Sequence, residues 1–148
     1  MKKLVLLFAA LLVAGCGEKS LSDSAIDKAL EEAVEYDSLQ ERNDLYYQVN
    51  KSEPYTGWVK STYDSGQATE LGRFKDGKQD GPYITWHENG QKEGEGTFKD
   101  GKPDGLCTGW HENGQKAAEA TFRDGEMVSA KYWNSKGEEV ETEEEARK

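Results

Sequence analysis

The chain has 148 residues, of which 32% are charged and 34% are hydrophobic. That length is enough for one domain. Its 29 acidic and 19 basic side chains give a formal net charge of −10 at pH 7. Such a surface is repelled by nucleic acid and by anionic lipid headgroups, so neither is an expected partner. We take the negative charge as a source of solubility rather than as a sign of a cationic partner.

The first residues, MKKLVLLFAALLVAGC, have the layout of a secretory signal peptide. Two lysines precede an apolar run from Leu4 to Val13, and small residues follow before Cys16. A run of about ten apolar residues is too short to span a bilayer. Residues 1–15 are therefore predicted to be a signal peptide that is removed, which makes the mature chain still more acidic.

The end of this segment, VAGC at 13–16, resembles the lipobox of bacterial lipoproteins. The resemblance implies cleavage before Cys16 and attachment of acyl chains such as palmitate to that residue. Each buried methylene contributes roughly 0.8 kcal/mol, so several chains anchor a soluble domain. The alternative is an ordinary signal peptide with a chance cysteine. By analogy with enterobacterial sorting, Gly17 in place of aspartate indicates the outer membrane, facing the periplasm, in a Gram-negative host.

Residues 16–38 are predicted to be a lipidated tether followed by a short helix. Serines at the start of residues 22–36 can cap a helix, and acidic residues lie close behind them. The apolar positions follow a helical spacing but include few large side chains. They are Ile26, Leu30, Ala33 and Val34. The helix is therefore either a stalk or a weakly docked cover.

From residue 39 to about residue 140, a repeat of 24 residues replaces the helical spacing, and we assign this stretch to one β-repeat domain. Residues 57–80, 81–104 and 105–128 align, and a truncated copy follows. Glycine and phenylalanine recur at equivalent positions, as in Phe74, Phe98 and Phe122. The last residues, 141–148, are acidic with little to bury and are predicted to form a disordered tail.

Each unit contains two turn signals. Asn-Gly stands at 89–90 and 113–114, and Asp-Gly stands at 76–77, 100–101 and 124–125. Both dipeptides favour two-residue turns with positive φ at both central positions. The segments between them have about the length of strands. The predicted fold class is therefore mainly β: an elongated antiparallel meander of hairpin repeats, with an N-terminal signal segment and a short helix.

This layout resembles the bacterial variant of the MORN (membrane occupation and recognition nexus) repeat. The resemblance is carried by EGEGTFKDGKPDG at 93–105 and WHENGQK at 110–116, and it covers roughly residues 39–140. With the lipobox, the chain also resembles bacterial lipoproteins that often carry a label as antitoxin components of toxin–antitoxin systems. The common eukaryotic unit begins Tyr-Glu-Gly, whereas this chain has Lys92-Glu93-Gly94 at that position.

The motif WHENGQK occurs twice, so its residues are either a site built twice or one structural unit copied. If residues 89–90 close a two-residue hairpin, Trp86 faces Glu93 and Thr85 faces Gly94. Alternation then places Trp86 on one face of the sheet with Ile84. The other face receives the large rings beside small residues, which can pack a thin sheet. Its rings and small residues are Tyr83, His87, Phe98, Gly94 and Gly96, with Ala118 and Ala120 in the next unit.

His87 and His111 would lie one unit apart on the same face, and two imidazoles can ligate a metal. A zinc site needs at least three protein ligands, and the equivalent positions hold Tyr63 and Asn134. Two strand spacings, roughly 10 Å, would also separate the two rings. The repeated glutamates of the motif lie beside exposed turns. We therefore predict no metal, no cofactor and no catalytic activity, and interpret the motif as structural.

The four tryptophans are the predicted binding residues. Trp86 and Trp110 align, Trp133 falls in the same column after a one-residue slip, and Trp58 lies near the start of the array. Aligned indoles can bind a peptide, a glycan or a partner's helix. They can equally fill the hydrophobic face of the sheet, and both roles are compatible if the N-terminal helix covers part of that face.

The sequence therefore favours a non-catalytic lipoprotein that is anchored to a membrane of the cell envelope through Cys16. Its MORN-like module would bind an envelope protein or a glycan, and not nucleic acid. The alternative is an antitoxin or immunity protein of an envelope toxin–antitoxin pair, which also works by binding. Cys107 is predicted to be a small buried apolar side chain rather than a reactive thiol.

Overall fold

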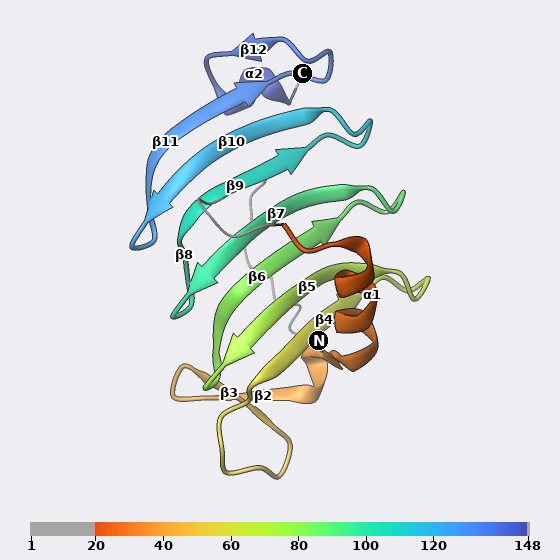
Figure 1. The fold of residues 1–148 in the computed structure, drawn as a ribbon, viewed down its shortest axis with the longest axis vertical. Coiled ribbons are helices and arrows are strands. Elements are labelled where there is room, and N and C mark those ends of the chain that lie inside the picture. The colour runs from red at the N-terminus through yellow and green to blue at the C-terminus, as the bar shows by residue number, and fades with distance from the viewer. Residues whose placement is uncertain (1–19, 148) are drawn as a thin grey trace.

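The computed structural model describes residues 20–147, so the predicted signal peptide and the predicted lipid-attachment residue Cys16 lie outside the described residues. Within that range, ten strands form one long curved sheet (Figure 1). They are β1 (Val34–Glu35), β4 (Gly57–Thr62), β5 (Ala68–Lys75), β6 (Lys78–Trp86), β7 (Lys92–Lys99), β8 (Lys102–Pro103), β9 (Gly105–Trp110), β10 (Lys116–Arg123), β11 (Glu126–Trp133) and β12 (Glu139–Val140).

From β4 onward the strands follow one another through the sheet in chain order, and every pair is antiparallel. Short β8 continues into β9 along the same edge of β7. This arrangement confirms the predicted mainly β meander. At its start, β1 pairs with β4 in the parallel sense, which the sequence did not predict.

The Asp-Gly turns have the geometry that the sequence predicts. Asp76 and Gly77 have φ of 49° and 79°, and Asp100 and Gly101 have φ of 50° and 82°. Positive φ at both central residues is the mark of a type I′ turn, which suits the twist of the flanking strands. The residues on either side of the first turn, Lys75 and Lys78, are paired across the hairpin, as expected for a two-residue loop.

For the Asn-Gly turns the prediction of a two-residue loop is wrong. Gly90 has φ of 83°, but Asn89 does not share a positive φ. The loop instead closes from His87 to Gln91, with the His87 N–H donating to the Gln91 carbonyl at 2.9 Å. The Asn89 Oδ1 accepts from the Gln91 N–H at 2.9 Å, so the asparagine stabilises the loop through its side chain rather than through a positive φ. Trp86 consequently pairs with Lys92 rather than with residue 93.

Two different faces result from the alternation along the strands. Leu71 and Ile84, exposed to 0% and 1%, lie on the first, which we call the helix face. On the second, the groove face, the rings of Tyr83 and Phe98 meet edge to face with centroids 5.4 Å apart. A Cβ on Gly72 would lie 3.2 Å from the Tyr83 ring, so this ring needs the glycine beneath it. The predicted packing of rings over small residues is therefore present.

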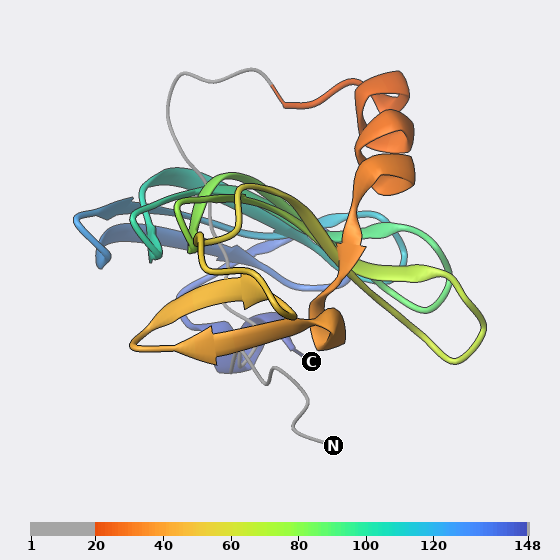
Figure 2. The ribbon, with the colours of Figure 1, turned by 90° about the horizontal axis from the view of Figure 1, so that it is seen from below.

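Helix α1 (Asp23–Glu32) lies on the helix face as a docked cover and not as a free stalk (Figures 1 and 2). The Ser22 hydroxyl caps its start by accepting from the Ala25 N–H at 3.3 Å. Ile26 and Ala29 are buried in a cluster with residues of β5 and β6. The helix is shorter than predicted, because Val34 leaves it to pair with β4 in strand β1.

Two strands form a separate hairpin on the groove face, β2 (Leu39–Arg42) and β3 (Leu45–Gln48), after the short helix η1 (Tyr36–Ser38) (Figure 2). The Tyr46 ring contacts Phe74 of the main sheet with centroids 5.6 Å apart. The Tyr46 N–H also donates to the Gly77 carbonyl at 2.9 Å. This hairpin therefore covers one end of the groove face.

At the other end of the same face, the acidic tail forms helix α2 (Glu143–Ala146) instead of the predicted disordered segment (Figure 2). Thr142 caps it, because its Oγ1 accepts from the Glu145 N–H at 3.3 Å. Ala146 is only 4% exposed. Disorder was predicted because this segment contains few apolar residues. The segment nevertheless docks, with Ala146 buried and Thr142 capping the helical turn.

Candidate functional site

A groove of about 350 Å³ lies on the groove face, bordered at the C-terminal end by α2. Its floor is formed by small residues on adjacent strands, because the register pairs Gly94 of β7 with Gly109 of β9, and Gly109 with Ala118 of β10. Three neighbouring strands thus present almost no side-chain volume at the same level of the sheet. The hollow is a direct consequence of this row of small residues.

Aromatic side chains and α2 enclose the row. Tyr83 and Phe98 lie on one side, and Tyr132, which pairs with Ala118, lies on the other. Ala146 of α2 reaches the same space. The lining also includes the buried Cys107, which the sequence predicted to be a small buried side chain. The interior of the groove is therefore largely apolar.

Carboxylates dominate its rim. Glu93 and Glu112 are exposed and border the opening, and Glu143 joins them from α2. The basic side chain at this rim, Arg147, forms an ion pair with Glu143. With Glu95 counted as well, four carboxylates against the guanidinium of Arg147 leave the rim negative.

The tyrosines of the groove stay neutral at physiological pH. Burial raises the pKa of Tyr83 well above its ordinary value of 10.0, and the charge of Glu70 and a hydrogen bond to its Oε2 add to the rise. Burial also raises the pKa of Tyr132, with a smaller contribution from Glu143. The Tyr83 hydroxyl donates to Glu70, and this bond holds the ring in place.

The structure separates the four predicted tryptophans. Trp58 and Trp86 pack against the cluster that buries α1, so they help to hold the helix. Trp133 lies beyond them, with the Lys116 Nζ 5.3 Å from the centroid of its ring. Trp110 is half-buried and contributes to the lining of the groove. They do not converge on one site, and their role in binding stays a prediction.

The repeated histidines link one unit to the next. The His87 Nε2–H donates to the Trp110 carbonyl at 2.8 Å, and the His111 Nε2–H donates to the Trp133 carbonyl at 2.8 Å. In the first unit the Tyr63 hydroxyl makes the equivalent bond to the Trp86 carbonyl at 3.0 Å. Across residues 20–147, no group of three or more His, Cys, Asp or Glu side chains is placed to hold a metal ion.

The asparagines of the motif add a parallel set of links. The Asn89 Nδ2 donates to the Glu112 carbonyl at 2.8 Å, and the Asn113 Nδ2 donates to the Ser135 carbonyl at 2.8 Å. Each asparagine therefore closes its own loop through Oδ1 and contacts the next loop through Nδ2. The histidine and asparagine side chains of WHENG are thus occupied within the array, whereas Glu88 and Glu112 are exposed.

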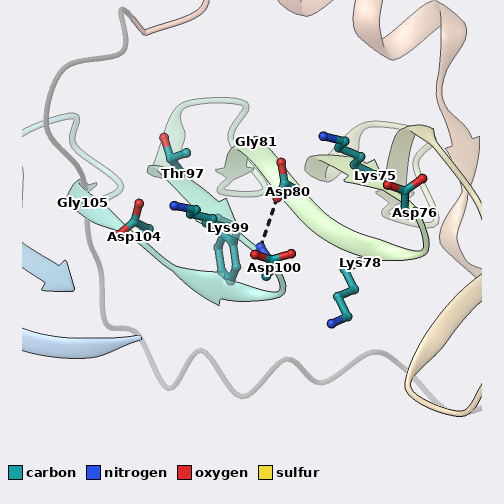
Figure 3. A pocket seen from close by; sticks show the side chains of 11 residues that line it. Lys75, Asp76, Lys78, Asp80, Gly81, Thr97, Lys99, Asp100, Asp104 and Gly105 are labelled. Atoms are coloured by element: carbon teal, nitrogen blue, oxygen red, sulfur yellow. Dashed lines mark hydrogen bonds between the residues drawn. The ribbon is translucent and has the colours of Figure 1, made fainter. Parts of the chain in front are cut away.

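A second hollow, of about 740 Å³, lies beside the Asp-Gly turns (Figure 3). There the Asp100 N–H donates to the Asp80 Oδ2 at 3.1 Å, so Asp80 serves the neighbouring turn. Figure 3 shows the side chains of Lys75, Lys78 and Lys99 pointing in different directions. Acidic and basic groups mix around this hollow without converging, and it is a weaker candidate than the groove.

The sequence did not predict the groove, although it contained a signal for it. Gly94 and Ala118 were expected to make room for rings, but the register places them level with a third small residue, Gly109. Tyr83 instead pairs with Gly72 and Gly96 on its two sides. Which glycines remain uncovered depends on the register between strands, and the bulge in each hairpin sets that register.

Comparison with known proteins identifies the centre of the array. A family model described as the MORN repeat variant matches residues 79–100 and 103–124. These stretches contain the whole floor of the groove. No curated protein and no solved structure matches the chain.

The helices described between residues 20 and 147 are all too short or too polar to cross a membrane. The matched stretches, which run from β6 to β10, lie inside a longer series of hairpins with the same geometry. The chain therefore contains two units of the MORN repeat variant at the centre of its β-meander.

Proposed function

We propose that this chain is a non-catalytic binding module, tethered to a membrane of the cell envelope through a lipid on Cys16. Part of a protein partner occupies its groove. The observation that carries this proposal is the hollow over Gly94, Gly109 and Ala118, which in the described residues 20–147 lies between the β2–β3 hairpin and α2 on one face of the sheet. Repeat arrays serve as binding frameworks because the exposed residues can vary while the packing stays the same.

The placement of α1 is compatible with a tether. The described chain enters α1 on the helix face, whereas the groove lies on the opposite face (Figure 2). The lipobox-like residues 13–16 and the apolar run before them support lipid attachment.

Two features support a role without catalysis. The imidazoles of His87 and His111 donate to backbone carbonyls and hold the array together. The groove phenols are kept neutral, and the rim carboxylates of Glu93 and Glu112 are exposed to water. General acid–base chemistry needs a group with a pKa near the working pH at the place of reaction.

The tether is tested by metabolic labelling of producing cells with an alkyne analogue of palmitate. We expect label on the wild-type chain and none on Cys16→Ser. An unlabelled wild-type chain, or equal label on both, would refute lipid attachment at Cys16.

The binding role is tested by photo-crosslinking in intact cells, with a benzophenone amino acid at Glu112 on the rim or at Lys131, an exposed residue of the helix face. We expect a discrete protein adduct from position 112 that is absent from position 131. Ala118→Leu, which fills the groove, should reduce that adduct. Adducts from position 131 alone would overturn the proposal. A captured protein that is toxic when produced alone would make the binding role that of an antitoxin.

A further inference from the structure

The size of the groove limits what can enter it. Its volume of about 350 Å³ is near the lower end of the roughly 300–1,000 Å³ of ligand sites. One turn of an α-helix with its side chains, about 10–12 Å across and 5.4 Å long, occupies roughly 500 Å³, which is more than the volume of the groove. One or two large side chains of an extended segment match the volume better.

The interior selects for apolar side chains. The floor residues Gly94, Gly109 and Ala118 carry no polar side-chain atoms, and the buried side chains of Phe98 and Cys107 adjoin them, so the floor is apolar. The ring of Tyr83 stands beside it with its hydroxyl already donating to Glu70. A polar guest would lose its hydration here without gaining partners, whereas an apolar guest removes apolar surface from water.

The rim selects for positive charge. The charged and titratable side chains that border the opening are Glu93, Glu95, Glu112, Glu143, Arg147, His87 and His111. Arg147 is paired with Glu143, and the Glu95 carboxylate is paired with Lys92. The two histidines are bonded to backbone carbonyls, which leaves Glu93 and Glu112 as exposed charges facing solvent. Lysine or arginine on either side of an apolar guest complements this pair.

We infer that the groove binds an extended peptide segment in which one or two large apolar side chains are flanked by lysine or arginine. This inference rests on the proposed function, because it names the chemistry of the partner for the same site. The apolar side chains fill the space above Gly94, Gly109 and Ala118. The basic side chains reach Glu93 and Glu112, which lie in neighbouring units at the same edge of the sheet.

Three fluorescein-labelled hexapeptides test this chemistry: KKFLKK, EEFLEE and KKSSKK. Their binding to the full chain, purified in a non-ionic detergent, is measured by fluorescence anisotropy against a detergent blank. We expect saturable binding of KKFLKK, at least tenfold weaker binding of EEFLEE, and at least tenfold weaker binding of KKSSKK. Equal binding of KKFLKK and KKSSKK would overturn the inference, because charge alone would then account for it.

Charge reversal at the rim provides the matched test. Glu93→Lys combined with Glu112→Lys should weaken KKFLKK at least tenfold and strengthen EEFLEE. The control combines Glu88→Lys with Glu126→Lys, two exposed glutamates that do not line the groove. It changes the net charge equally and should leave the preference unchanged. A control that weakens KKFLKK as much as the rim variant does would refute the inference.

The two proposals can fail separately. If no hexapeptide binds but the adduct from position 112 still forms in cells, the binding role stands and the basic–apolar peptide chemistry is wrong. If both the adduct and peptide binding are absent, both proposals are wrong.

Discussion

The Nε2–H of His87 donates to the backbone carbonyl of Trp110, one repeat further along the chain, at 2.8 Å. The bond lies where the strands have ended, so backbone pairing no longer joins the two units there. The histidine side chain therefore connects consecutive loops by a hydrogen bond beyond the last paired residues of the strands. The same bond recurs from His111 to Trp133 and, with a phenol donor, from Tyr63 to Trp86.

His87→Ala should lower the free energy of unfolding by about 1 kcal/mol, because the Trp110 carbonyl loses its donor. Urea denaturation followed by circular dichroism measures the change. Glu88→Ala, an exposed position in the same loop, should change the stability by less than about 0.5 kcal/mol. His87→Tyr should recover much of the loss, since Tyr63 makes the equivalent bond in the first unit. A His87→Ala variant as stable as Glu88→Ala would show that the hydrogen bond from His87 to Trp110 contributes nothing to the stability of the fold.

The Asp-Gly turns allow a matched pair of substitutions, Gly77→Ala and Gly101→Ala, in which the backbone geometry is alike and the neighbouring atoms differ. Gly101 and Gly77 have φ of 82° and 79°, so alanine at either position is strained by roughly 1 kcal/mol. A Cβ on Gly101 would meet nothing within 4 Å, whereas one on Gly77 would lie 3.0 Å from the Cβ atoms of Leu45 and Pro54. Gly77→Ala should therefore lower the melting temperature more than Gly101→Ala, and equal losses would contradict the packing of the β2–β3 hairpin on this turn.

These turns also show how far the sequence predicts the fold. Asp-Gly and Asn-Gly both favour two-residue turns, and the 24-residue period correctly predicts where turns occur along the chain. Only the Asp-Gly pairs form two-residue turns, because Asn89 binds the Gln91 N–H and the Glu112 carbonyl through its side chain. The second of these bonds reaches a different repeat, so no reading of a single dipeptide can predict it.

The candidate site was less predictable than the fold. Rings over small residues were expected, but the groove depends on Gly94, Gly109 and Ala118 lying level in three strands. The level that Gly94 shares with Gly109 depends on a shift of register between β8 and β9, because Phe98 pairs with Pro103 whereas Glu95 pairs with Thr108. The pairing of Thr85 with Gly94 is as predicted, so the groove was missed because the pairing of Gly94 with Gly109 across the next hairpin was not foreseen.

Stability should fall in strong base, and Tyr83 should account for part of the fall. Its pKa is raised in the folded state, so the folded chain keeps this proton after the unfolded chain has lost it. Below pH 10 the phenol is neutral in both states, and the stability is unaffected. As the pH rises above 10, the unfolded state is favoured progressively. Urea unfolding at pH 9 to 11.5 should show a smaller decline for Tyr83→Phe, and an identical decline would contradict the burial of this hydroxyl.

Trp86→Ala and Trp110→Ala should separate the two roles that aligned indoles can have. Trp86 packs against the cluster that buries Ile26 of α1, so its loss should cost about 2 kcal/mol and expose the helix amides to hydrogen exchange. Trp110 lies outside that cluster and lines the groove. Its replacement should weaken adduct formation from position 112 while the β circular dichroism signal persists. Loss of that signal in Trp110→Ala would assign the residue to the core instead.

Ala146→Asp should release α2 from the sheet, because it places a carboxylate where the side chain is 4% exposed. Hydrogen exchange at residues 143–146 should accelerate, whereas Lys136→Asp, in the exposed loop before β12, should leave it unchanged. The pKa of Tyr132 offers a second readout, since burial and then Glu143 raise it. Undocking moves Glu143 away from the phenol, so the pKa of Tyr132 should fall towards 10 in a spectrophotometric titration of Ala146→Asp. An unchanged exchange rate and an unchanged pKa together would mean that α2 does not form the end of the groove.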